Sequence, residues 1–150
     1  MEISYRKLTV SELDIFIKMR IDQLREEGNK EESDLEPALR DYYTRHMADG
    51  TFISWIALDN EEIVGTSGIS IVEKPPYFGC PSGKIGLLSS MYTLKSYRRN
   101  GIAKELLSRI VNEARNRECS TIQITASNMG VYLYSAFGFT KNNNFMQYKL

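Results

Sequence analysis

Cysteine and histidine are scarce in this sequence. Cys80 and Cys119 are its only cysteines and stand far apart, so neither a disulfide framework nor a Cys-x-x-Cys metal or redox site is indicated. His46 has no second histidine with which to form a histidine metal site. The sequence therefore predicts no metal cofactor and two buried or incidental thiols, which suit a reducing cytoplasm.

Net charge and long apolar runs are also absent. With 19 basic and 19 acidic residues, the chain as a whole has no electrostatic reason to bind nucleic acid or an anionic membrane. No run approaches the ~18 apolar residues of a membrane span. The first residues, MEISYRKL, lack the charged leader and apolar stretch of a signal peptide. We therefore expect a cytoplasmic protein with no nucleic-acid and no membrane partner.

Charge is distributed unevenly along the chain. Residues 12–36 hold nine acidic and four basic side chains, a net charge of −5, whereas residues 95–118 hold seven basic and three acidic ones, a net charge of +4. Two interpretations are open for each segment. In one interpretation, each charged segment is a helix face exposed to solvent. In the other, the acidic segment lies near a cationic substrate and the basic segment lies near a phosphorylated ligand.

The 150 residues, 42% of them hydrophobic, suffice for one domain over residues 1–150. Periodicity and turn residues predict the elements of the first half: a strand at 3–7, helices at 9–28 and 35–50, and strands at 51–58 and 63–72. Thr9 and Glu12 have the spacing of a capping box. Residues 59–62 form a hairpin turn, and a polar loop runs from Glu73 to Lys84.

The second half begins with a strand at 85–94 and a helix from Gly101, followed by a strand at 121–125 and a helix at 130–137. Phe139 and residues 145–150 form the last strand, with an Asn142-Asn143-Asn144 turn between them. Apolar residues at helical spacing form the buried stripe of the first of these helices: Ile102, Leu106, Leu107, Ile110, Val111 and Ala114. The strand, helix and strand around it predict one parallel crossover in an otherwise antiparallel sheet.

Residues 98–103, Arg-Arg-Asn-Gly-Ile-Ala, connect a strand to a helix. Their backbone N–H groups would be the unpaired donors of a helix start, at the positive end of the helix dipole. Gly101 and Ala103 keep the backbone accessible, and Arg98 and Arg99 add charged donors, so a diphosphate is the natural ligand. An ordinary helix start with solvated arginines explains the hexapeptide equally well when it is taken alone.

These residues resemble the acetyl-CoA-binding signature of the GNAT superfamily of N-acetyltransferases, commonly written [RQ]-x-x-G-x-[GA]. Met91-Tyr92-Thr93 looks like the bulged strand end that precedes it. Residues 126–139 are similar to the second signature of the family, with Leu133, Tyr134, Gly138 and Phe139 at its L-Y-x-x-x-G-F positions. The order of elements also fits, so the resemblance spans nearly the whole chain.

The resemblance implies an α/β (α+β) fold of a single N-acetyltransferase domain. Its mixed, mostly antiparallel central sheet has six or seven strands and about four flanking helices. The fourth and fifth strands splay apart beyond Met91 and Thr125, and acetyl-CoA lies in that cleft. The implied binding residues are Met91, Tyr92, Thr93, Arg98, Arg99, Asn100, Gly101, Ile102, Ala103, Lys104, Asn128 and Tyr134.

The activity implied is direct transfer of the acetyl group from acetyl-CoA to a primary amine, with a small molecule as the expected acceptor. Tyr134 matches the tyrosine that protonates the departing thiolate in many relatives, as a phenol of pKa ~10 can do. Core packing is the alternative role for Tyr134, and Tyr132 is a second candidate acid. Asn128 either hydrogen-bonds the pantetheine arm or forms a turn.

The general base is harder to assign, because residues 86–90 hold no carboxylate where some relatives have a glutamate. Water held by Ser89 or Ser90, or the Glu73 carboxylate, are the alternatives. Cys80 as an acyl carrier is a further option.

Two other classes of function stay open beside the enzyme. One is a non-catalytic acyl-CoA-binding sensor or regulatory domain, and the other is a nucleic-acid-binding module, which the zero net charge disfavours. The acceptor subfamily and the assembly, including a homodimer, are also open. Acidic residues in the first two helices favour a cationic acceptor, and three tyrosines either line its pocket or pack in the core: Tyr42, Tyr43 and Tyr77.

Overall fold

Six strands and four α-helices follow one another in the computed structural model, which describes residues 1–142 and 144–150. The elements are β1 Ile3–Lys7, α1 Leu13–Glu26, α2 Glu36–Ala48, β2 Phe52–Ile53, β3 Trp55–Asp59, β4 Glu62–Glu73, β5 Lys84–Thr93, α3 Ile102–Asn116, β6 Thr121–Gln123 and α4 Gly130–Phe137. The strands lie in the order β1-β3-β4-β5-β6, and β2 pairs with β4. All pairs are antiparallel except β5 with β6.

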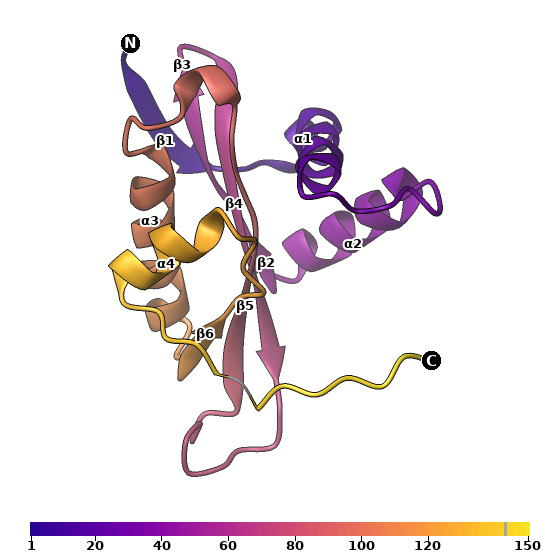
Figure 1. The fold of residues 1–150 in the computed structure, drawn as a ribbon, viewed down its shortest axis with the longest axis vertical. Coiled ribbons are helices and arrows are strands. Elements are labelled where there is room, and N and C mark those ends of the chain that lie inside the picture. Colours follow the sequence, from indigo (N-terminus) through magenta and orange to yellow (C-terminus); the bar gives the residue numbers. More distant parts are fainter. Residues whose placement is uncertain (143) are drawn as a thin grey trace.

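Helices cover both faces of this sheet. Figure 1 shows α1 and α2 on one face and α3 and α4 on the other. Phe16, Tyr43 and Phe52 lie in the core under α1 and α2, while Leu107 and Ile110 lie in the core under α3. The mixed, mostly antiparallel sheet with four flanking helices is thus confirmed. None of the described helices is both long and apolar enough to cross a membrane.

The start of the first helix follows the predicted capping box. The Thr9 N–H donates to Glu12 Oε1 at 3.0 Å, and a short 3-10 turn at Val10–Glu12 leads into α1. Arg6 Nη2 pairs with Glu12 Oε2 at 2.7 Å. Hydrogen bonds from Arg6 above all, and from Thr9, lower the pKa of Glu12 to about 2, so the carboxylate stays charged at the helix start.

The predicted strand at residues 51–58 is two strands, interrupted at Ser54. The Trp55 N–H donates to the Ser67 side-chain oxygen at 3.1 Å, and the Ser54 carbonyl accepts from the Leu8 N–H at 2.9 Å. The Ser67 hydroxyl and the Leu8 N–H therefore occupy the Trp55 N–H and the Ser54 carbonyl, which a continuous strand would have used in its pairing. The hairpin turn after β3 is confirmed, because Asp59 pairs with Glu62.

The prediction that Phe139 and residues 145–150 form a last strand is wrong for the described chain, which has no strand after β6. Phe139 packs instead on the Tyr134 ring, with centroids 5.5 Å apart, so it belongs to the α4 cluster. Residues 145–150 are unpaired and extend away from the sheet. The predicted asparagine turn includes Asn143, which lies outside the described residues.

Candidate functional site

The two parallel strands part soon after they pair. β5 and β6 are matched at only three positions, the last of which is Leu87 opposite Gln123. β5 then continues to Thr93, whereas β6 ends at Gln123. The expected splay is confirmed, but it begins four residues before Met91 and two before Thr125. It leaves backbone groups of β5 without a β6 partner in the described chain.

A bulge in β5 lies beside the parted strands. Ser90 has a positive φ of 58°, and two residues of β5 oppose one of β4 between the Thr66–Tyr92 and Gly68–Ser89 pairs. The Thr66 hydroxyl donates to the Ser90 carbonyl at 2.7 Å, which fixes the bulge. The bulge re-aims the strand end at Met91 to Thr93, as the resemblance implied.

The turn before α3 presents unpaired backbone donors. Arg99 and Gly101 both have positive φ, 64° and 78°, and the first helical hydrogen bond runs from the Glu105 N–H to the Gly101 carbonyl at 3.1 Å. None of the N–H groups from Arg99 to Lys104 has an acceptor among the described residues. Six amides at the positive end of a helix make a candidate anion site, which we call the anion turn (residues 99–104).

Gly101 keeps this turn open. A Cβ at Gly101 would have no heavy atom within 4 Å, so the space beside the backbone is free for a ligand. Its φ of 78° is also a conformation that residues with a Cβ rarely adopt. Glycine is therefore required here for the shape of the turn as well as for access.

Arg98 and Arg99 have different roles in the structure. The Arg98 Nε donates to the Thr93 carbonyl at 2.8 Å, Nη2 pairs with Glu26 Oε1 at 3.0 Å, and the guanidinium lies 5.6 Å from the centre of the Tyr92 ring. Arg98 therefore ties the anion turn to β5 and α1. Arg99 is exposed on the turn itself.

Glu26 connects the end of α1 to the same strand. Its carboxylate accepts a hydrogen bond from the Tyr92 hydroxyl as well as from Arg98, and these bonds lower the pKa of Glu26, with the Tyr92 bond as the largest cause. Burial first, and then the hydrogen bond to Glu26, raise the pKa of Tyr92 to about 12. Gln23 adds a second connection, because its amide donates to the Met91 carbonyl at 3.1 Å.

Tyr134 projects inward from α4. Its ring folds back over Gly130, where an added Cβ would lie 2.9 Å from Tyr134 Cε2, so glycine is needed for the ring to take this position. The residue is 6% exposed. Its hydroxyl has no hydrogen-bond partner among the described residues.

The surroundings keep this phenol protonated. Burial first, and then the negative charge of Glu27, raise the pKa of Tyr134 to about 12. Glu27 follows α1, on the opposite face of the sheet from α4 (Figure 1). Its charge therefore acts on Tyr134 from the other side of the sheet. Tyr132, by contrast, is 81% exposed on the outer side of α4.

Three residues from α1 and its end join this site without having been predicted: Gln23, Glu26 and Glu27. The signal available was the negative charge of residues 12–36. Asn128 is exposed near the start of α4 and makes no hydrogen bond with a described residue.

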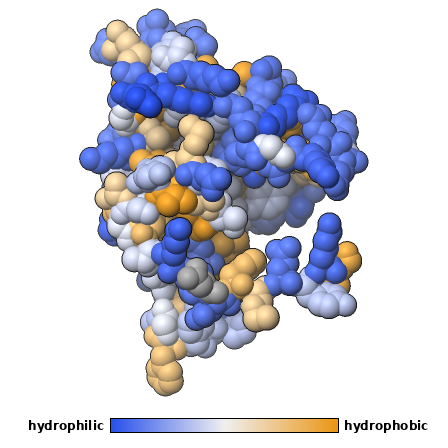
Figure 2. Space-filling view, viewed as in Figure 1, coloured by the Kyte–Doolittle hydropathy of each residue, from blue (hydrophilic) through white to orange (hydrophobic). Residues whose placement is uncertain are grey.

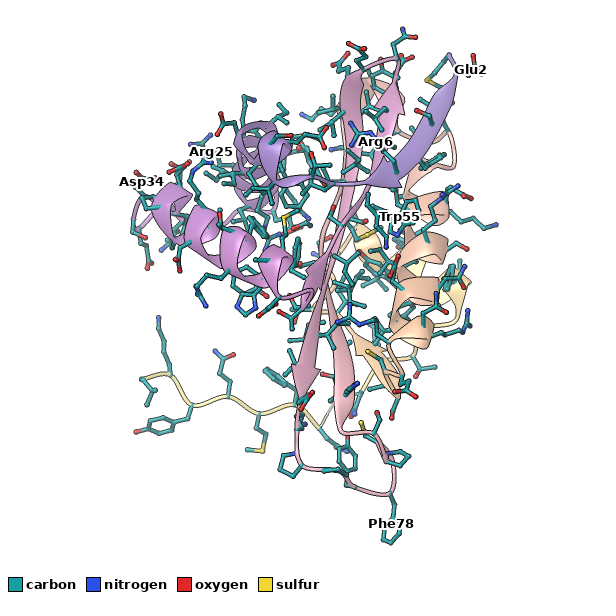
Figure 3. All side chains as sticks on the ribbon, turned by 180° about the vertical axis from the view of Figure 1, so that it is seen from behind. Glu2, Arg6, Arg25, Asp34, Trp55 and Phe78 are labelled. Atoms are coloured by element: carbon teal, nitrogen blue, oxygen red, sulfur yellow. The ribbon has the colours of Figure 1, made fainter. Side chains whose placement is uncertain are left out.

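Other predicted candidates lie elsewhere. Glu73 pairs with Lys84. It lies seven positions along β4 from Thr66 beside the bulge, a distance of roughly 23 Å in an extended strand. Cys80 is fully buried in the β4–β5 connection and its thiol donates to the Lys84 carbonyl, so it is not available as an acyl carrier. Figure 3 shows the tip of that connection, Phe78, at the end of the molecule opposite Glu2.

Tyrosines and acidic residues elsewhere do not complete the site. Tyr42 packs edge-on against Tyr43 and Phe52, and the Tyr43 ring packs on Phe52 at a tilt of 45°. A depression of about 420 Å³ between α1, the β3–β4 turn and Leu94 contains none of the predicted site residues.

No group of three or more His, Cys, Asp or Glu side chains is placed to hold a metal in residues 1–142 and 144–150.

Known proteins share this fold. A solved structure with acetyl-CoA, of a protein from Clostridium acetobutylicum described as a predicted acetyltransferase, is 30% identical, covers 99% of the chain and 96% of its own, and has a TM-score of 0.95. The aminoglycoside acetyltransferase AAC(6')-Iy, in complex with a bisubstrate analogue, is 20% identical, covers 100% and 99%, and has a TM-score of 0.79.

Sequence relatives agree with this likeness. Rat N-acetyltransferase 8B is 31% identical over 119 residues, which are 74% of this chain and 50% of that protein, so the chain spans about half the length of this relative. Aminoglycoside N(6')-acetyltransferase type 1 of Salmonella typhimurium is 26% identical over 69% of the chain and 78% of its own length. The model of the acetyltransferase (GNAT) family matches residues 16–139, and the chain belongs to this family.

Proposed function

We propose that the chain transfers the acetyl group of acetyl-CoA directly to a primary amine of a small molecule. The observation that carries this proposal is the anion turn: six unpaired amides with open space beside Gly101. The parted strands lie next to it, and the Tyr134 hydroxyl is free of protein partners in the described chain. The anion turn fits a diphosphate, the parted strands fit an extended thiol arm, and the Tyr134 hydroxyl fits a thioester.

The chain's residues divide the binding of acetyl-CoA between them. The amides of the anion turn bind the pyrophosphate, with the exposed Arg99 and Lys104 side chains as charged donors. The backbone of Met91 to Thr93 and the Asn128 amide bind the pantetheine arm. An N–H near Tyr92 binds the thioester oxygen, and Arg98 holds the turn against β5 through its bond to the Thr93 carbonyl.

Acetyl-CoA supplies an activated acetyl group. The amine nitrogen attacks the thioester carbon, the carbon–sulfur bond breaks, and the sulfur leaves with the bonding electron pair. Tyr134 gives its proton to that sulfur, because its pKa of about 12 keeps the hydroxyl protonated until a thiolate forms beside it. The proton lost by the amine passes to the Glu27 carboxylate, directly or through water.

The acceptor follows from the charge of the site. Glu26 at the end of α1 is paired with Arg98, whereas the charge of the next carboxylate, Glu27, acts on Tyr134. A protonated amine is attracted to this end of the site before it loses its proton. Relatives of the chain include aminoglycoside acetyltransferases, which supports a cationic small molecule as the acceptor.

Acetyl-CoA should raise the melting temperature of the chain, because a ligand that binds only the folded state adds RT ln(1 + [L]/Kd) to its stability. Thiol release with a panel of aminoglycosides, polyamines and amino acids then identifies the acceptor. An unchanged melting temperature at millimolar acetyl-CoA would rule out both an enzyme and a sensor. Binding without thiol release for any amine would favour the acyl-CoA sensor instead.

Replacing Glu27 with glutamine should lower kcat/KM for the acceptor by about 10-fold or more, with little change in the Kd of acetyl-CoA. The amide keeps the size of the side chain and removes its charge and basicity. Glu32→Gln is the matched control, since Glu32 is an exposed carboxylate five residues further on that has no ion-pair partner among the described residues. Equal losses in the two variants would assign the effect to overall charge.

A further inference from the structure

Arg20 differs from the other arginines of α1 and α2 in having no carboxylate partner in the described chain. Arg25, Arg40 and Arg45 each form an ion pair with an aspartate or glutamate of their own helix. The Arg20 guanidinium instead donates from Nη1 to the amide oxygen of Gln23, at 3.1 Å. Most of its N–H donors therefore have no acceptor among the described residues and are available to a ligand.

This guanidinium lies on the inner side of α1. Arg20 is partly buried, whereas Tyr43, in the core under α1 and α2, is 3% exposed. Burial raises the pKa of Tyr43, and the positive charge of Arg20 is among the effects that oppose this rise, so the two side chains are close. A charge that is partly removed from water without a partner costs stability. Arg20 is therefore placed to receive a negative charge from a ligand.

Gln23 connects Arg20 to the acetyl-transfer site. Arg20, Gln23 and Glu27 are spaced three and four residues apart, so they share one face of α1 and its end. The Gln23 amide accepts from Arg20 and donates to Glu27 Oε1 at 3.2 Å and to the Met91 carbonyl at 3.1 Å. A cation, an amide and a carboxylate thus lie in a row beside the end of β5.

We propose that the acceptor is an amino acid, whose ammonium group meets Glu27 and whose carboxylate binds Arg20. The inference rests on the proposed function, in which Glu27 receives the proton of the amine, and it narrows the acceptor to a molecule that is cationic at its reacting end and anionic at the other. One amide group separates Arg20 from Glu27, a spacing that a small molecule can bridge.

A carboxylate suits this position better than other charged groups. A guanidinium binds a planar carboxylate with two parallel hydrogen bonds, and one cation neutralises one such charge. A polyamine with one nitrogen at Glu27 would instead bring a second positive charge toward Arg20, and like charges repel. Figure 2 shows that the surface over α1 and α2 is mostly hydrophilic, whereas apolar side chains gather over α4. The α1 side is therefore suited to a polar acceptor.

Thiol release from acetyl-CoA, measured with α- and ω-amino acids and with the carboxamide of each, tests the proposal. The carboxamide keeps the amine and the size of the molecule and removes the negative charge. For the amino acids that are acetylated, we expect kcat/KM to be about 10-fold or more above that of the carboxamide. Equal kcat/KM for the acids and their carboxamides would overturn the proposal without any variant.

Arg20→Gln should reduce the ratio of acid to carboxamide to about one, by raising KM for the acid while kcat/KM for the carboxamide changes little. Activity on the carboxamide shows that the variant is folded. Arg25→Gln is the matched control, because Arg25 is an exposed arginine of the same helix that pairs with Asp22, and this variant should keep the ratio of the unmodified chain. A ratio that survives in Arg20→Gln would contradict the role of Arg20.

The same assay separates failure of this inference from failure of acetyl transfer itself. Thiol release with aminoglycosides or polyamines, but with no amino acid, would overturn the amino-acid acceptor and leave the transferase intact. Thiol release with no amine of any kind would count against the proposed function as well.

Discussion

Tyr134→Phe is expected to lower the single-turnover rate of acetyl transfer by about 100-fold or more, while the Kd of acetyl-CoA changes little. The substitution keeps the ring, and therefore its packing on Phe139 and over Gly130, and removes only the hydroxyl. That hydroxyl is needed when the thiolate leaves and has no structural partner in the described chain. Single-turnover rates are required because slow product release would hide a chemical defect.

Tyr132→Phe is the control on the same helix, since its hydroxyl belongs to an exposed side chain. The pH dependence gives an independent check. With a pKa of about 12, Tyr134 should cause no loss of activity on the alkaline side until the pH approaches that value. A normal single-turnover rate in Tyr134→Phe would end its role as the acid and leave Tyr132 or solvent as the proton donor.

Gly101→Val should raise the Kd of acetyl-CoA by about 100-fold or more. A valine cannot readily adopt the φ of 78° at this position, so the anion turn must change shape, and the branched side chain would fill the space beside the amides. Isothermal titration calorimetry with acetyl-CoA measures the loss. The melting temperature without ligand should also fall, because the strained backbone costs about 1–3 kcal/mol.

Gly50→Val separates strain from loss of the site. Gly50 has a φ of 77°, and an added Cβ there would meet only the end of the Arg117 side chain at 3.8 Å. Its valine variant should lose similar stability and keep its affinity for acetyl-CoA. Wild-type affinity in Gly101→Val, or an equal loss of affinity in Gly50→Val, would contradict the assignment of the turn.

The parts of the site that could be predicted are those encoded within short segments. The anion turn depends on a glycine at a helix start, and Tyr134 depends on a glycine four residues earlier on its own helix. The apolar stripe of α3 faces the sheet as expected, with Ile102, Leu106 and Leu107 all buried. In each case the controlling residues lie within two helical turns, so spacing alone determines the geometry.

The contribution of α1 could not be predicted in the same way. Glu26 accepts from Tyr92 and Arg98, which follow it by 66 and 72 residues, and no local spacing links them. The same limit applies to Ser90, whose positive φ depends on the opposing strand. Residues 145–150 have the local pattern of a strand, but a pattern cannot provide a strand with which they would pair.

The strand order also determines when each edge of the sheet can form during folding. β4 and β5 are joined by a connection that closes between Glu73 and Lys84, whereas β1 must reach β3 across 48 positions from Lys7 to Trp55. Closing the longer loop costs about 1 kcal/mol more entropy. The three central strands therefore have the more local route to pairing, and we expect β1 to join a sheet whose middle has already formed. Until β1 arrives, β3 is an open edge in the folding chain, exposed to pairing with other molecules.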